Sequence, residues 1–323
     1  MKTRAIRIHK TGGPEVLQFE EIDLPDPGAG EIRVRNKAIG LNFIETYFRS
    51  GLYPVKLPFT LGSEAAGVVD AVGDGVTNVK PGQRVAYNSG GAYAELTNVP
   101  AARALPLPDG VSDEAAASLL LKGATAEYLL RRTFRVEKGQ TILWHAAAGG
   151  VGLIATQWAK HLGCTVIGTV GSDDKVAIAK AHGCDHVINY RTENVVERVK
   201  EITGGKKVPV VYDGVGKDTF LTSLDCLAPR GLLVSFGNAS GPVTGVDLGI
   251  LAQKGSLYVT RPTLATYAAS PKDYAEIGAE VFDVVAKGAV RIEIGQRYKL
   301  ADAAQAHRDL EARKTTGATV LLP

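Results

Sequence analysis

A glycine-rich stretch in the middle of the chain has the residue types and spacing of a phosphate-binding turn. His145–Gly152 reads His-Ala-Ala-Ala-Gly-Gly-Val-Gly, and it joins the apolar run Thr141–Trp144 to the amphipathic segment Leu153–Lys160. In a strand–turn–helix unit, free backbone N–H groups and the positive end of the helix face a pyrophosphate, and glycines let the backbone approach it closely. The first glycine of G-x-G-x-x-G is absent, so the pattern is A-x-x-G-x-x-G, from Ala146 to Gly152. The alternative is a turn with only a packing role, but the flanking strand and helix favour a dinucleotide site. Its expected contacts are Ala148, Gly149, Gly150, Val151 and Gly152.

The residues after the second strand of such a unit decide which dinucleotide binds. An acidic residue there accepts hydrogen bonds from the ribose 2′-OH of NAD and repels a 2′-phosphate. Here the candidates to hold a 2′-phosphate are Gly171, Ser172, Lys175 and Tyr190, the last by packing on the adenosine. Asp173 and Asp174 argue against a phosphate unless they point into solvent or cap the next helix, and a solvated surface lysine is the usual alternative for Lys175. We predict NADPH.

Metal-ligand and acid–base constellations do not stand out in the chain. The first domain has no cysteine and no histidine between His9 and His145, and the three cysteines, all in the nucleotide domain, are scattered. Glu64 is a possible ligand without partners, so we expect no catalytic metal. We interpret His145, beside the glycine turn, as a buried histidine satisfied by the backbone.

One segment of the first domain is dense in polar and aromatic side chains. Gly40–Tyr53 holds Asn42, Tyr47 and Tyr53 together with a carboxylate and an arginine. From composition alone, a functional role and a capped surface helix with packed tyrosines are equally good interpretations.

The order of expected elements indicates two domains of different type. The first third reads as short strands and turns, for example the alternating Glu31–Ile39, and favours a compact β-rich barrel. From Asp113, where Ser112 is a candidate N-cap, strands and helices alternate, and Thr192 is the expected cap of a helix over Glu193–Ile202. This alternation predicts a doubly wound parallel sheet. The expected strands of the sheet are Gln140–Trp144, Thr165–Val170, Asp185–Ile188, Pro209–Asp213, Leu232–Phe236 and Ser256–Val259. The last elements, a helix over Ala301–Glu311 and a strand over Ala318–Leu322, could return to the first domain.

Composition excludes several classes of function. The chain has 323 residues, a formal net charge of +3, 45% hydrophobic and 22% charged residues, and no basic tract, which argues against nucleic-acid binding. Three cysteines imply no disulfide framework. The N-terminus has no apolar signal core, and no apolar run approaches the roughly 18 residues of a membrane span. We expect a cytoplasmic protein.

Several segments together resemble a known family. These are Gly12–Leu17, Gly40–Tyr47, Ala146–Gly152, Tyr212–Gly216, Ser235–Gly241, Leu248–Leu251 and Gly255–Pro262. The chain resembles the zinc-free, ζ-crystallin-like quinone oxidoreductases of the medium-chain dehydrogenase/reductase superfamily, with the bacterial NADPH:quinone reductases most similar. The zinc-containing relatives carry Gly-His-Glu where this chain reads Gly62-Ser63-Glu64, and the cysteine lobe of their structural zinc is missing.

The resemblance implies an α/β fold with two domains. A GroES-like barrel would form from residues 1–122 and 263–323, with a Rossmann domain, residues 123–262, inserted and the cofactor in the cleft between them. Asn42 would lie near the nicotinamide, and Tyr47 and Tyr53 would line a quinone pocket. The other expected cofactor contacts are Thr125, Gly171, Ser172, Lys175, Tyr190, Phe236, Gly237 and Arg313. The family also implies a homodimer, formed near Ser256–Val259.

The expected reaction is hydride transfer from NADPH to a quinone, without a metal and without a dedicated acid. Tyr47 is the best side-chain proton donor if one is used. Two alternatives remain open. One is reduction of an activated C=C bond in enones or alkenals, and the other is a weakly catalytic NADPH-binding protein with a structural or RNA-binding role, against which the modest charge argues.

Overall fold

The computed structural model describes all residues, 1–323, and the chain forms two compact units. Unit 1 comprises Met1–Leu121, Ser270–Phe282 and Ile292–Pro323, and unit 2 comprises Lys122–Ala269 and Asp283–Arg291. Residues 263–269, expected in the first domain, lie in unit 2, where Tyr267 stacks on Tyr128 with ring centroids 4.7 Å apart. No helix is long and apolar enough to cross a membrane.

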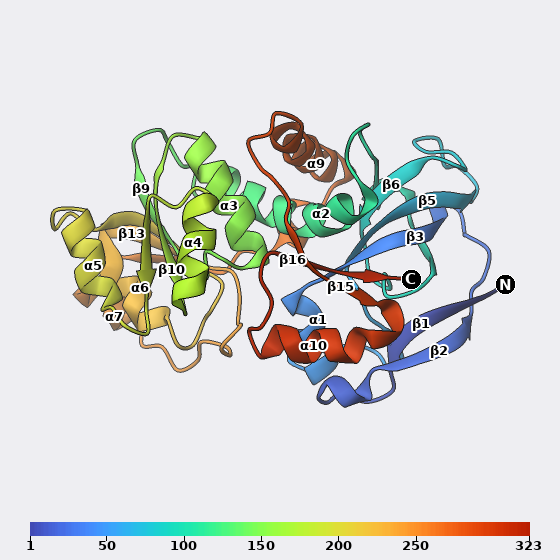
Figure 1. Cartoon of the computed structure of the whole chain (residues 1–323), viewed down its shortest axis with the longest axis horizontal. Helices are drawn as coiled ribbons and strands as arrows, with labels where there is room; N and C mark the ends of the chain where they lie inside the picture. The colour runs from blue at the N-terminus through green and yellow to red at the C-terminus, as the bar shows by residue number, and fades with distance from the viewer. The chain divides into compact units, whose positions relative to one another are not determined.

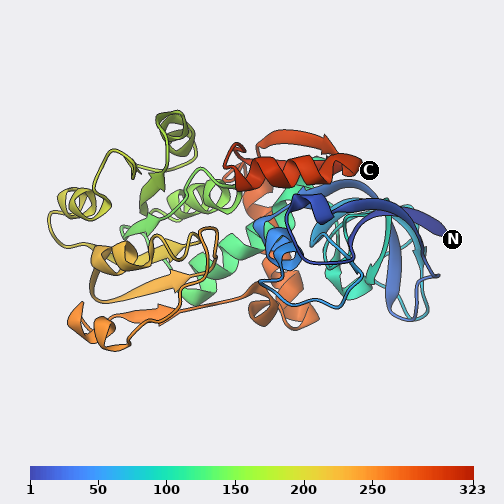
Figure 2. The ribbon, with the colours of Figure 1, turned by 90° about the horizontal axis from the view of Figure 1, so that it is seen from below.

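Unit 1 is built around two sheets, in which every pair of neighbouring strands is antiparallel except the parallel pair β15–β16. The smaller sheet has the order β2-β1-β4, and the larger one has the order β15-β16-β3-β5-β6-β8, with β7 also paired to β3. The bounds are β1 Lys2–Ile8, β2 Gln18–Asp23, β3 Glu31–Leu41, β4 Phe59–Thr60, β5 Glu64–Val72, β6 Arg84–Asn88, β7 Leu96–Pro100, β8 Ala104–Pro106, β15 Ile294–Lys299 and β16 Ala318–Leu322. Both chain ends belong to this unit, because β16 pairs antiparallel with β3 (Figures 1 and 2).

Three helices of unit 1 matter for the site: α1 (Phe43–Ser50), α9 (Pro271–Ala286, continuing into unit 2) and α10 (Ala303–Glu311). α1 follows β3 directly, and its apolar residues cannot form a stable helix alone, because eight residues are too few in water. Its stability must therefore come from packing on the barrel, whose buried core includes Ile6, Ile39, Leu61 and Tyr93.

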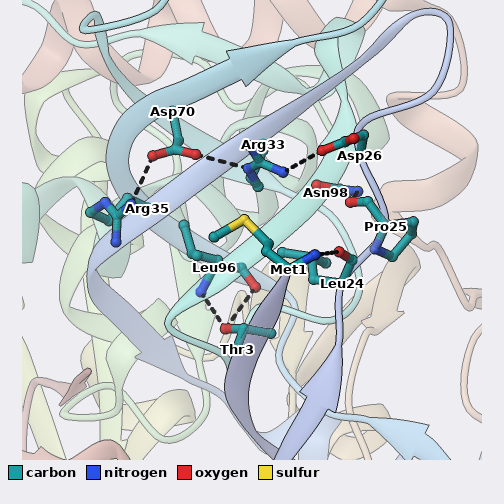
Figure 3. A network of polar contacts seen from close by, with 10 residues as sticks. All are labelled: Met1, Thr3, Leu24, Pro25, Asp26, Arg33, Arg35, Asp70, Leu96 and Asn98. Carbon is teal, nitrogen blue, oxygen red and sulfur yellow. Dashed lines mark hydrogen bonds and ion pairs between the residues drawn. The ribbon is translucent and has the colours of Figure 1, made fainter.

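Charged side chains on β3 and β5 fix the register of the larger sheet (Figure 3). Arg33 Nε donates to Asp70 Oδ2 over 2.8 Å, and Arg35 Nη2 donates to Asp70 Oδ1 over 2.8 Å. These bonds hold the pKa of the Asp70 carboxyl below its usual value, and the bond from Arg33 has the largest effect. Nearby, the Thr3 hydroxyl accepts from the Leu96 N–H over 3.0 Å and so ties β1 to β7.

Unit 2 contains one six-stranded sheet in which every neighbouring pair is parallel. The order is β11-β10-β9-β12-β13-β14, which is the doubly wound order of a Rossmann domain. The bounds are β9 Thr141–Trp144, β10 Thr165–Val170, β11 His186–Asn189, β12 Val208–Asp213, β13 Leu227–Ser235 and β14 Tyr258–Thr260. The doubly wound fold expected from the alternating pattern is confirmed.

The helices of unit 2 are α2 (Asp113–Glu127, which begins in unit 1), α3 (Gly150–His161), α4 (Asp173–Ala181), α5 (Val195–Ile202), α6 (Phe220–Cys226), α7 (Gly249–Gln253) and α8 (Leu264–Tyr267). The expected cap Ser112 is confirmed, since its hydroxyl accepts from the Ala115 N–H over 3.2 Å. Thr192 is wrong as the cap of α5. Asn194 has that role, because its side-chain oxygen accepts from the N–H groups of Val196 and Glu197.

Candidate functional site

The glycine turn of unit 2 has the geometry of an anion-binding helix start. Gly149 is the extended N-cap of α3 and no side chain caps the helix, so its first N–H groups are not taken by a capping residue. A Cβ on Gly152 would lie 2.5 Å from the carbonyl oxygen of Ala146 and 2.6 Å from that of Ala147. Only glycine therefore lets α3 begin this close to β9, and the turn fits a pyrophosphate.

Ala146, the first position of A-x-x-G-x-x-G, has an unusual backbone conformation. Ala146 takes a left-handed conformation with φ of 54°, which glycine adopts more easily than alanine. The Gly149 N–H donates to the Ala146 carbonyl over 2.9 Å and the Ala147 N–H to the Thr169 carbonyl over 3.0 Å, so the turn is held at both ends. The expected phosphate contacts Ala148–Gly152 thus lie together at the turn and the start of α3.

The residues expected to hold the adenosine end also lie together. A Cβ on Gly171 would be 2.4 Å from the Tyr190 hydroxyl, so the tyrosine packs directly on this glycine, while its side chain is half exposed. Ser172 is the N-cap residue of α4, and the Lys175 N–H donates to the Ser172 carbonyl over 3.2 Å. These four residues form one open surface patch beside the ends of β10 and β11.

The two aspartates that argued against a 2′-phosphate are exposed, and each has a hydrogen-bond partner beside the patch. Asp173 Oδ1 accepts from the Asn189 amide over 2.8 Å. A hydrogen bond from Ser172 is the main cause that lowers the pKa of Asp174. Both aspartates lie in the first turn of α4, where the helix dipole favours negative charge. Both side chains are exposed to solvent, which is one of the two arrangements under which a 2′-phosphate is expected to be tolerated, and the 2′-phosphate site stays a prediction.

The ends of β12 and β13 form a third part of the unit 2 site. The Phe236 ring lies 5.5 Å from the Trp144 ring, and a Cβ on Gly237 would lie 2.3 Å from the Gly214 carbonyl oxygen. The buried carboxylate of Asp213 organises this edge, because it accepts from the N–H groups of Val215 and Gly216 over 2.8 and 3.0 Å. Sequence reasoning gave Asp213 no role, although an acid at the end of a buried strand before glycine was a usable signal.

His145 is buried as expected, but its partner was wrongly expected to be the backbone. Its Nδ1 pairs with the Thr169 hydroxyl over 2.9 Å, and its Nε2 has no hydrogen-bond partner. Burial lowers the pKa of this imidazole below its ordinary value. The side chain therefore supports the strand ends as a neutral group.

In unit 1, Tyr47 lies in α1, Asn42 precedes the helix and Tyr53 follows it. Asn42 is the N-cap residue, and its backbone N–H donates to Glu45 Oε2 over 2.7 Å. The Tyr47 and Tyr53 rings meet edge to face with centroids 5.2 Å apart, and both side chains are half exposed. The capped-helix interpretation of this segment is confirmed, and the functional roles of its side chains stay predictions.

Two expected cofactor contacts belong to other elements of the chain. Thr125 lies half exposed in α2, and Arg313 lies exposed just after α10 with a left-handed backbone, φ of 59°. Each has an accessible side chain, and their roles stay predictions.

Glu64, expected as an isolated candidate ligand, is fully buried and engaged in hydrogen bonds. Its Oε1 accepts from Asn42 Nδ2 over 3.0 Å, and its Oε2 accepts from the Leu121 N–H over 2.7 Å. The structure contains no group of three or more His, Cys, Asp or Glu residues that could hold a metal ion.

A buried polar network anchors the C-terminal end of α1. Arg49 donates to both carboxylate oxygens of Glu311, over 3.0 and 2.6 Å, and to His307 Nδ1 over 3.0 Å. Tyr93 and His307 pair over 3.2 Å through the hydroxyl and Nε2. Sequence reasoning missed this network, because its members are far apart in the chain.

Two family models match the chain in the units just described. The "Alcohol dehydrogenase GroES-like domain" matches residues 28–109, and the "Zinc-binding dehydrogenase" model matches residues 150–280. A GroES-like domain combined with a Rossmann-type sheet is the architecture of the medium-chain dehydrogenase/reductases.

Similar proteins narrow the class further. A quinone oxidoreductase of Pseudomonas aeruginosa is 59% identical over 99% of both chains. The crystal structure of the Escherichia coli quinone oxidoreductase complexed with NADPH has a TM-score of 0.98 and 54% identity, covering 99% of this chain and 100% of that one. A 2-haloacrylate reductase of Burkholderia is 45% identical over 98% of both chains. The chain belongs to the quinone oxidoreductase family of the medium-chain dehydrogenase/reductase superfamily.

Proposed function

We propose that this protein is an NADPH-dependent quinone oxidoreductase that works without a metal. The observation that carries the proposal is the likeness over the full chain to quinone oxidoreductases, joined to a glycine turn that fits a pyrophosphate. Support for NADPH over NADH comes from the Gly171–Tyr190 patch and from the exposure of Asp173 and Asp174 to solvent.

The residues of unit 2 would bind and orient the cofactor. The start of α3, from Ala148 to Gly152, would hold the pyrophosphate by its N–H groups and dipole. Lys175 would pair with the 2′-phosphate, Tyr190 would pack on the adenosine, and Phe236 with Gly237 would border the nicotinamide half. When bound, NADPH supplies the hydride, so the protein need only align the reactants.

The residues of unit 1 would receive the acceptor. Tyr47 and Tyr53 offer an aromatic edge on which a planar quinone can pack, and Asn42 offers a carboxamide to the nicotinamide or its ribose. The reduced quinone takes up a proton that water can deliver, and the Tyr47 hydroxyl is the best protein donor. Zinc-independence is supported by Ser63 in the Gly-Ser-Glu sequence and by the bonds that occupy Glu64.

A second candidate acceptor is an activated C=C bond. The full-length likeness to a 2-haloacrylate reductase favours it, because such a substrate also accepts hydride at an electron-poor carbon. The aromatic pair of unit 1 does not distinguish a quinone from a haloacrylate.

The outer edge of the unit 2 sheet supports a homodimer. β14 ends that sheet and exposes Tyr258 and Val259, with Leu248 exposed before it. An unpaired apolar edge strand is a natural surface for a second copy. We propose that the two copies pair along β14.

The test is NADPH oxidation, followed by its absorbance, with 1,4-benzoquinone, 9,10-phenanthrenequinone, an enone, 2-chloroacrylate and no acceptor, each repeated with NADH. Turnover with the quinones and a strong preference for NADPH is the expected result. Turnover only with the enone or chloroacrylate would show that the acceptor is an activated C=C bond and not a quinone. Tight NADPH binding without turnover on any acceptor would refute the proposed enzymatic function.

Lys175→Ala tests the 2′-phosphate assignment within the same assay. Losing a charge-assisted hydrogen bond should raise the KM for NADPH roughly tenfold or more and leave the KM for NADH nearly unchanged. Lys180→Ala, an exposed lysine on the same helix, is the matched control. Equal effects of Lys175→Ala on both cofactors would contradict the assignment.

A further inference from the structure

Glu64 is a fully buried carboxylate that holds the side chain of a candidate site residue. Its Oε1 accepts from Asn42 Nδ2 over 3.0 Å, while Glu45 Oε2 accepts from the Asn42 backbone N–H over 2.7 Å. A carboxamide has a donor end and an acceptor end, and only the donor end can pair with a carboxylate. Glu64 therefore fixes the donor end of the Asn42 carboxamide, while the capping box of α1, in which the Asn42 side chain accepts from the Glu45 N–H, takes the acceptor end.

The surrounding chain is built to admit this carboxylate. A Cβ on Gly40 would lie 2.5 Å from Glu64 Oε1 and 2.2 Å from the Ala117 carbonyl oxygen. Glycine weakens a strand interior, so its presence in β3 marks a close approach of another group. The second oxygen of Glu64 accepts from the N–H of Leu121, the last residue of unit 1 before the chain enters unit 2.

The stability of the fold alone does not explain why a glutamate is buried at position 64. Burying a carboxylate is costly, and an apolar side chain of similar volume often serves a core as well or better. What an apolar residue or a glutamine cannot do is accept from both N–H groups and exclude the reversed orientation of Asn42. A glutamine can either donate or accept, so it would pair with Asn42 in both orientations.

We propose that Glu64 is a positioning residue, which fixes the orientation of the Asn42 carboxamide toward the nicotinamide half of the cofactor. The inference rests on the proposed function, because it assumes the contact between Asn42 and the nicotinamide half that was proposed there. Glu64 itself touches neither cofactor nor acceptor in this assignment, and it acts only through Asn42.

Binding of two nucleotides to Glu64→Gln tests the proposal. NADPH contains the nicotinamide riboside, and adenosine 2′,5′-bisphosphate lacks it. Calorimetry should show about tenfold weaker binding of NADPH, the loss expected when one well-oriented hydrogen bond is released, and unchanged binding of the bisphosphate. Equal weakening of both nucleotides, or of neither, would overturn the inference.

Asp70→Asn is the matched control for a general loss of stability. Asp70 lies on the same strand, β5, and its carboxylate also accepts hydrogen bonds on both oxygens, from Arg33 and Arg35. The control should lower the unfolding free energy and leave both affinities unchanged. If Glu64→Gln does not fold, Glu64→Asp is the alternative variant. Aspartate keeps a carboxylate, which only accepts hydrogen bonds, but its shorter side chain holds the carboxylate farther from Asn42. We then expect a smaller loss of affinity, confined to NADPH.

A double-mutant cycle separates action through Asn42 from any other role. In the Asn42→Ala background, Glu64→Gln should cause no further loss of NADPH affinity, because the group that Glu64 orients is gone. Additive losses would refute the inference. Failure of the proposed function would give a different result, because the wild-type protein itself would then not reduce quinones with NADPH.

Discussion

His307 should make the stability of the protein depend on pH. The side chain is fully buried, and Arg49 Nη1 donates to its Nδ1 over 3.0 Å, so the imidazole hydrogen lies on Nε2, facing the Tyr93 hydroxyl. A second proton would have to enter on Nδ1, against the guanidinium. Burial first, and the Arg49 charge second, lower the pKa of His307 from 6.5 to about 3.

The sign and size follow from linkage. The unfolded chain binds a proton at His307 below about pH 6.5 and the folded chain does not until about pH 3, so the stabilisation is complete above 6.5 and is lost as the pH falls through this window. One pH unit is worth about 1.4 kcal/mol, so lowering the pH from 8 to 5 should remove about 2 kcal/mol of unfolding free energy through this residue.

The assay is urea unfolding at pH 8, 7, 6 and 5, followed by far-ultraviolet circular dichroism, for wild type and His307→Asn. Asparagine can still accept from Arg49 but does not titrate, so the stability difference between wild type and variant should shrink by about 2 kcal/mol toward pH 5. A difference that stays constant across the range would refute the reasoning.

Three further outcomes are expected. Gly152→Ala should lower the unfolding free energy by roughly 1–3 kcal/mol and abolish tight NADPH binding, since its Cβ would lie 2.5 Å from the Ala146 carbonyl oxygen. In Gly149→Ala the new Cβ would lie 3.1 Å from the same oxygen, so a thermal melt should show a clearly smaller loss of stability. Dialysis against EDTA should leave the quinone reductase rate unchanged, and a loss restored by zinc would contradict the metal-free proposal. Val259→Lys should convert the proposed dimer to monomer in light scattering, while Leu221→Lys, at an exposed residue of α6, should not.

Much of unit 2 could be predicted because its signals are local. Strands buried on both faces read as short apolar runs, and the glycine turn combines strand, turn and helix within a few residues, so β10 was predicted with its observed bounds. A prediction was wrong where two nearby residues could both cap the same helix. Thr192 and Asn194 are both good caps, and Asn194 has the role because its side chain reaches two N–H groups of α5.

The contacts that orient the site of unit 1 could not be predicted from local sequence. Glu64 lies on another strand than Asn42, and the partners of Arg49 come from the opposite end of the chain. Neither pair leaves a periodic signal, because a single buried hydrogen bond between distant residues is specified only by the folded topology. The resemblance to a family supplied the expected roles of Asn42 and Tyr47, but not the groups that hold them.

α1 shows why these distant contacts matter for the site. An isolated helix of eight residues is marginal in water, so its position must be set by what it touches. Its N-terminal end is held through Asn42 by Glu64, and its C-terminal end is held through Arg49, which also donates to the Gly12 carbonyl over 3.1 Å. Tyr47 lies between these two anchors. The orientation of the aromatic pair is therefore a property of the closed barrel, formed only when residues from both ends of the chain have come together.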